Sequence, residues 1–96
     1  MRAHLDVSAS DHLVIEFRNS PDADWEALKN RLVEELGFRR DGTPVVGLDE
    51  SIYPDFKRSN LTLAAGRDNW SGHYLLSQCA SGDDFLRTLF GTLQAY

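Results

Sequence analysis

A nucleophile and a base are the first residues to test for chemistry in this 96-residue chain. The single cysteine, Cys79, is the obvious nucleophile, and His73 is the nearest histidine in sequence. Nucleophilic catalysis needs a base within hydrogen-bond reach of the nucleophile. The two residues lie on one predicted strand over 73–79, which separates them by about 20 Å at the rise of a strand. They cannot form a dyad, so we predict no catalytic residue and expect Cys79 to be a small buried side chain.

Histidines and carboxylates near the start of the chain are candidate metal ligands. His4 and His12 both fall on the polar face of a predicted hairpin, near Asp6 and Glu16. Two histidines and two carboxylates can hold zinc, but this spacing matches no metal motif. We therefore predict neither a metal site nor a cofactor.

Phosphate-binding motifs are also missing from the sequence. Residues 80–84 form a strand-to-helix turn, but two aspartates in it would repel a phosphate. The basic pairs Arg39-Arg40 and Lys57-Arg58 would make a positive patch only if both members of a pair faced the same way. Alternation along a strand sends them to opposite faces.

An aromatic residue in a polar loop is harder to explain. Trp70 falls in the predicted loop 66–72, beside Asp68 and Asn69. It either folds back onto the edge of the core or stays exposed as an aromatic anchor for a partner, since tryptophan is enriched in binding hot spots. Tyr53 is a weaker candidate of the same kind.

Net charge separates the two halves of the chain. The 15 acidic and 10 basic residues give a net charge of −5, which argues against a general nucleic-acid binder. Residues 1–50 carry this charge, while residues 51–96 are neutral. Acidic residues that include Glu34 and Glu35 lie off the apolar stripe of the first predicted helix, where they form a solvated face or steer a basic partner.

Two helices have clear sequence signals. Ser20 as cap, Pro21 in the first turn and Gly37 as a stop predict a helix over 21–36, with an apolar stripe of Trp25, Leu28, Leu32 and Leu36. Ser81 and Asp84 form a capping box for a second helix over about 82–95. Gly91 within it suggests close packing.

Strands fill the remainder of the chain. The first hairpin, turning at 8–10, is expected to place Asp6 opposite His12 and Arg2 opposite Glu16. The Asp41-Gly42 dipeptide predicts a second hairpin, between 38–40 and 43–46.

Two further signals place strands within the sheet. Pro54 cannot donate to a ladder, so its strand lies at an edge or contains a bulge. Leu75 and Leu76 put apolar groups on both faces of their strand, which we therefore place centrally.

These elements predict a single α+β domain over 1–96, in the order ββ-α-ββββ-α. Its antiparallel sheet has five to six short strands, with both helices packed on one face. No signal peptide or membrane-spanning segment is evident, so we expect a cytoplasmic protein without a membrane partner.

The function that we expect is that of a small, acidic, non-enzymatic protein-binding domain. An inhibitor or immunity-type protein for a basic partner fits the size and charge. One alternative is a ligand-binding or enzymatic domain with a pocket lined by groups such as Tyr53, His73 or Tyr74. Another is a homodimer formed through the strand that bears Pro54 or through the last helix.

Overall fold

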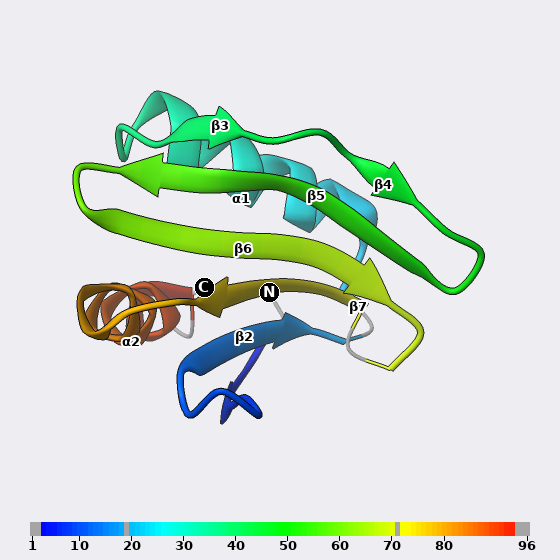
Figure 1. Ribbon diagram of the computed structural model, residues 1–96, viewed down its shortest axis with the longest axis horizontal. Coiled ribbons are helices and arrows are strands. Elements are labelled where there is room, and N and C mark those ends of the chain that lie inside the picture. Colours follow the sequence, from blue (N-terminus) through cyan, green and yellow to red (C-terminus); the bar gives the residue numbers. More distant parts are fainter. Residues whose placement is uncertain (1–2, 19, 71, 94–96) are drawn as a thin grey trace.

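A computed structural model of the chain describes residues 3–18, 20–70 and 72–93 (Figure 1). The strands are β1 (His4–Val7), β2 (Leu13–Phe17), β3 (Arg39–Asp41), β4 (Val45–Val46), β5 (Glu50–Arg58), β6 (Leu61–Asp68) and β7 (Gly72–Ser77). The helices are α1 (Asp22–Glu34) and α2 (Ala80–Leu93). The predicted α+β class is confirmed, with seven strands in one antiparallel sheet.

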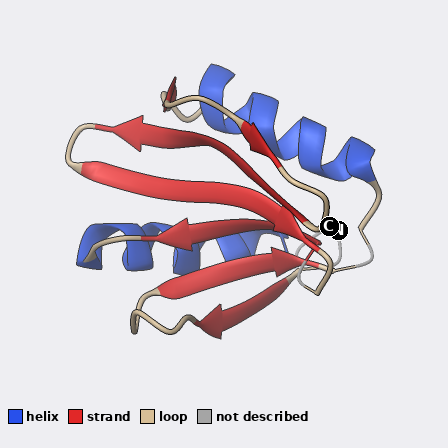
Figure 2. Cartoon of the chain, turned by 45° about the vertical axis from the view of Figure 1, so that its right-hand side comes forward, coloured by secondary structure: helices blue, strands red, loops and turns tan. Residues whose placement is uncertain are grey.

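The sheet has the order β1-β2-β7-β6-β5-β3, and β4 pairs with β5 beyond the end of β3. Strand β7 is central, as its two-sided apolar pattern predicted. Both helices lie on the same side of the sheet, α1 by β3 and β5 and α2 by β2 and β7 (Figures 1 and 2). Neither helix is long and apolar enough, within the part of the chain described, to span a membrane.

One hydrophobic core fills the space between the helices and the sheet. The strands contribute alternate residues to it, because a period of two turns one side of each strand inward. The helices add one stripe each. The core residues include Ile15, Phe17, Trp25, Leu28, Leu32, Phe56, Leu63, Leu75, Leu86, Leu89 and Leu93.

The first hairpin has a different register from the predicted one. His4 lies opposite Glu16, and Asp6 lies opposite Val14. The turn is longer than expected, because Ser8 N–H donates to the carbonyl of His12 at 2.8 Å. His12 therefore lies outside the ladder and cannot face Asp6. Arg2 is outside the described residues.

The second predicted hairpin does not form. Strands β3 and β4 both run antiparallel to β5, so they run in the same direction, one after the other. A bulge in β5 between Tyr53 and Phe56 separates their pairing segments. Pro54 lies in that bulge. Of the two predictions for its strand, an edge position or a bulge, the bulge is confirmed. Strand β5 is not an edge strand.

Helix ends follow the predicted signals in part. Gly37 has φ +76° and Phe38 N–H donates to Leu32 O at 3.0 Å, so α1 is followed by a glycine stop as predicted. At the start of α1, Pro21 rather than Ser20 occupies the capping position, without a side-chain cap. Gly91 is exposed and no atom lies within 4 Å of its would-be Cβ, so close packing does not explain it.

The start of α2 also differs from the prediction. The helix begins at Ala80, which places Cys79 rather than Ser81 just before it. Cys79 lies beyond the end of β7 and is only partly buried, so the expectation of a buried cysteine was wrong. Ser77 is the fully buried residue at that end of β7.

Candidate functional site

Trp70 lies in the tight turn between β6 and β7 with 88% of its surface exposed. Its backbone N–H donates to the Asp68 carboxylate at 2.8 Å, a local bond that closes the turn. The core is already filled by other aromatic rings, and Trp70 does not fold back onto it. Of the two interpretations, the exposed ring is the one found.

The turn between β4 and β5 lies beside the Trp70 turn. Glu50 is opposite Asp68 in the β5–β6 ladder, and the Asn69 amide donates to Asp49 at 3.2 Å. Figure 1 shows both turns projecting at the right-hand side of the sheet.

Large apolar side chains are exposed on these two turns, on the short strand β4 and near the start of β5. We call this set the hairpin-end surface, and it consists of Val45 (58% exposed), Val46 (83%), Leu48 (104%), Ile52 (47%) and Trp70 (88%). Val45 lies opposite Ile52 and shares its face of the sheet, whereas Val46 points to the other face. Single exposed apolar residues are ordinary on monomers, and larger exposed apolar patches are typical of interaction sites.

Acidic groups surround the hairpin-end surface. Asp49 and Glu50 belong to one turn and Asp68 to the other, against one basic residue, Arg67. Burial of the Tyr74 phenol raises its pKa, and the nearby charges of Glu50 and Asp68 raise it further. Three acidic residues against one basic residue give these four positions a net charge of −2.

The structure does not bring all predicted contact residues together. Trp70, Asp68 and Asn69 share one turn, whereas Glu34 lies at the far end of α1. The chain just beyond that end is held by Arg58, which donates to Leu36 O at 2.7 Å. Arg58 is eight residues along β5 from Glu50, about 26 Å at strand rise. Glu35 is in that same region and pairs with Arg31 at 3.5 Å.

A second group of polar side chains lies on the inner face of the sheet. His73 is 8% exposed and has a partner on each ring nitrogen. Nε2 contacts the Asp22 carboxylate at 3.0 Å, and Nδ1 contacts the Tyr53 hydroxyl at 3.1 Å. A carboxylate only accepts, so Nε2 carries the proton, and in the neutral ring Nδ1 then accepts from Tyr53.

Asp22 and Tyr53, the two residues that contact His73, both have shifted pKa values. The hydrogen bond from His73 lowers the pKa of Asp22. Burial raises the pKa of the Tyr53 phenol, which keeps it protonated as a donor. The three groups follow the order carboxylate, imidazole, hydroxyl. In nucleophilic sites, a carboxylate in this order orients the imidazole that acts as the base.

A pocket of about 260 Å³ opens next to Tyr53 and His73, between α1 and the strands β3 and β5. Its uncharged lining consists of Trp25, Tyr53, Pro54 and His73, and its charged lining consists of Glu26, Lys29 and Arg40. Tyr53 and His73 are residues that the sequence placed in a pocket. Tyr74 is on the opposite face of β7, which alternation requires.

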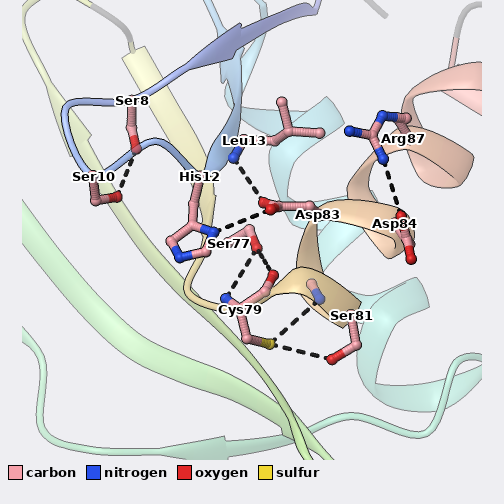
Figure 3. Close-up of polar contacts among 11 residues, drawn as sticks. Ser8, Ser10, His12, Leu13, Ser77, Cys79, Ser81, Asp83, Asp84 and Arg87 are labelled. Atoms are coloured by element: carbon pink, nitrogen blue, oxygen red, sulfur yellow. Dashed lines mark hydrogen bonds and ion pairs between the residues drawn. The ribbon is translucent and has the colours of Figure 1, made fainter.

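A third polar cluster joins the first hairpin to α2 (Figure 3). The Asp83 carboxylate accepts from Leu13 N–H at 2.8 Å and from His12 Nδ1 at 3.0 Å. These bonds, the Leu13 bond first, lower the pKa of Asp83 to about 2. Asp83 is one of the two aspartates in the turn at 80–84, and no local pattern indicated its contact with β2, which is 70 residues away in the chain.

Cys79 lies in the same region. Its Sγ is 3.3 Å from Ser81 Oγ and accepts from Gly82 N–H at 3.4 Å, and these two contacts lower the pKa of the thiol (Figure 3). His12 is directed to Asp83 and His73 to Asp22, so neither histidine is paired with the thiol. Within the described ranges, no three His, Cys, Asp or Glu side chains are arranged to hold a metal ion.

No protein-family model, curated protein or solved structure matches the chain.

Proposed function

We propose that this protein is a binding domain that docks a basic protein partner through its hairpin-end surface. The observation that carries the proposal is the exposure of Trp70 on a turn that contacts the β4–β5 turn, where Leu48 and apolar side chains of β4 and β5 are also exposed. An exposed tryptophan inside such a cluster has the composition of a binding hot spot.

Charge supports the choice of a basic partner. Asp49, Glu50 and Asp68 border the apolar residues, and the whole chain carries a net charge of −5. A rim of one sign speeds association with a partner of the opposite sign and disfavours partners of the same sign. An inhibitor or immunity-type protein that covers a basic surface would have this arrangement.

The acidic face of α1 is not needed for this contact. Glu34 and Glu35 are too far from Trp70 to share a compact interface with it, so we assign them no part in docking. The proposed interface draws on residues from both halves of the chain and lies away from the end of α1.

A second copy of the chain is the competing occupant of the same surface. Strand β4 has two residues and pairs with β5 alone among the described strands, and a free strand edge can pair with another chain. Sedimentation velocity at two concentrations separates the cases, because a heterologous binder sediments as a monomer at both. A dimer that Trp70→Ala dissociates would replace the proposal with self-association.

The decisive test compares capture from a cell lysate by the wild-type protein and by Trp70→Ala. Only a partner that uses this surface is lost from the variant. We place the protein in the cytoplasm, where a reducing environment suits the free thiol of Cys79.

A further inference from the structure

Arg40 is a half-buried cation that lines the inner pocket and forms no ion pair with any described side chain. Arg40 projects from β3 to the inner side of the sheet, where its guanidinium lies 4.0 Å from the centre of the Phe56 ring. Its neighbour Arg39 points to the outer side, because successive side chains alternate. Burial lowers the pKa of Arg40, which means that its charge is partly withdrawn from water.

The hydrogen bonds of Arg40 leave one edge of its guanidinium unused. Nε and Nη2 both donate to the carbonyl of Pro54, at 3.3 Å and 2.9 Å. No side chain in the described ranges forms an ion pair with Arg40 or accepts from its Nη1. Guanidinium groups bind carboxylates and phosphates through two parallel N–H groups, and the Nη1–Nη2 edge remains for such a contact.

The remaining pocket residues suit a small organic anion. The charged lining of Glu26, Lys29 and Arg40 has one net positive charge, and Lys29 pairs with Glu26 at 2.6 Å. The charges of Glu26 and Asp55 act on Arg40 without forming an ion pair with it. Tyr53 and Pro54 supply an apolar wall. The Tyr53 oxygen donates to His73 and still has lone pairs to accept a hydrogen bond.

The size of the pocket limits the ligand. The pocket has a volume of about 260 Å³ and is partly open to solvent. This is slightly below the usual range for drug-sized molecules, about 300–1,000 Å³. The ligand therefore has the size of one ring or a short chain with a single anionic group.

We propose that the pocket between α1, β3 and β5 is a binding site for a small organic anion, whose carboxylate or phosphate contacts Arg40 and whose apolar part packs against Tyr53 and Pro54. The site is separate from the hairpin-end surface and does not depend on the function proposed for that surface. It uses Arg40 for binding, and Tyr53 and His73 as hydrogen-bonding groups beside the ligand.

The test is an NMR titration followed at the indole N–H of Trp25. The chain has two tryptophans, so Trp70→Phe leaves Trp25 as the sole indole signal without disturbing the core. The probes are benzoate, phenyl phosphate and inorganic phosphate, with benzamide as the uncharged match of benzoate.

We expect a saturable shift with benzoate or phenyl phosphate, with a Kd on the order of 1 mM, as befits a ligand of this size. Benzamide should bind at least about tenfold more weakly, because it lacks the charge. Response to phenyl phosphate alone would identify the anionic group as phosphate, and response to benzoate alone would identify it as carboxylate. Binding of inorganic phosphate alone would contradict a role for the apolar wall.

Variants locate the contact. Arg40→Gln should weaken binding at least about tenfold, whereas Arg39→Gln, the adjacent arginine on the other face, should leave it unchanged. If Arg40→Gln fails to fold, Lys29→Gln serves as the second variant. It should raise the Kd for the anion, since it removes one positive charge from the lining. No saturable shift up to about 50 mM, equal binding of benzamide, or equal loss with Arg39→Gln would overturn the proposal.

Discussion

The indole of Trp25 and the imidazole of His73 lie parallel, with ring centroids 5.0 Å apart and 2° between the ring planes. Trp25 belongs to α1 and His73 to the central strand β7. With the His73–Asp22 contact, this stacked pair fixes the first half of α1 on the sheet. It also forms one wall of the inner pocket.

Removal of the stacked indole should be costly. Trp25 is 3% exposed, so Trp25→Ala leaves a cavity in the core and should lower the free energy of unfolding by about 3–5 kcal/mol. Urea denaturation measures the loss. Val33→Ala on the same helix is the control, because Val33 is 39% exposed and should cost less than about 1 kcal/mol. Similar losses for both variants would show that α1 is not held by this contact.

Two glycines should respond in opposite directions to alanine. A Cβ on Gly66 would lie 2.6 Å from the backbone oxygen of Ser51 and 2.5 Å from Tyr74 Oη, so Gly66→Ala should destabilise by about 1–3 kcal/mol. A Cβ on Gly91 meets nothing, so Gly91→Ala should stabilise the helix by about 0.5–1 kcal/mol. Thermal unfolding of both variants checks the pair, and a stabilising Gly66→Ala would contradict the close approach of β5 and β7 to this glycine.

Sequence patterns predicted the elements better than their pairing. Local signals such as the stripe of α1 and the stop at Gly37 depend on neighbouring residues, and they were correct. The register of the first hairpin depends on the length of its turn, where Asp11 adopts φ 66°, and composition did not reveal that. The Asp41-Gly42 turn signal was overridden because β5 is long enough to pair with β3 and β4 in succession.

The candidate sites were predictable to different degrees. Trp70 stood out because tryptophan is unusual in a polar turn. Arg40 did not, since alternation shows that it faces the inner side but not that it forms no ion pair with the described residues there. His73 shares a face with Leu75 and Ser77, which is a signal of burial, but its partners Asp22 and Tyr53 come from distant parts of the chain.

The contact of Asp83 with β2 should make stability sensitive to acid. The pKa of Asp83 is lowered in the folded state to about 2, mainly by Leu13 N–H and then by His12. A lowered pKa stabilises the fold above the unfolded-state value of about 4, and this contribution disappears as the pH falls from about 4 through about 2.

Substitution tests that pH dependence. Asp83→Asn should be less stable than the wild type in urea at pH 7, and the difference should shrink by pH 2. Asp84→Asn is the matched control, because Asp84 contacts only exposed groups and pairs with Arg87 on the surface. A difference between wild type and Asp83→Asn that is constant from pH 7 to pH 2 would rule out the charge of Asp83 as its cause.

The thiol of Cys79 should react at lower pH than an ordinary cysteine. Ser81 and Gly82 N–H lower its pKa, so the midpoint of its alkylation by iodoacetamide should lie at a lower pH than that of an ordinary cysteine. Ser81→Ala should move the midpoint upward, whereas Thr88→Ala, further along the same helix, should not. A midpoint at or above the ordinary value in the wild type would show that these contacts do not stabilise the thiolate.

Docking at the hairpin-end surface is tested most directly by quantitative capture from a lysate of the cells that make the protein. Wild type, Trp70→Ala and the control Val33→Ala are immobilised in equal amounts, and the retained proteins are compared by mass spectrometry. We predict one basic protein that is retained in stoichiometric amount by wild type and Val33→Ala. Its affinity should fall at least about 30-fold with Trp70→Ala, as for a hot-spot residue, and should weaken as salt is raised. Equal retention by all three proteins, or no stoichiometric partner on the wild type, would contradict the account.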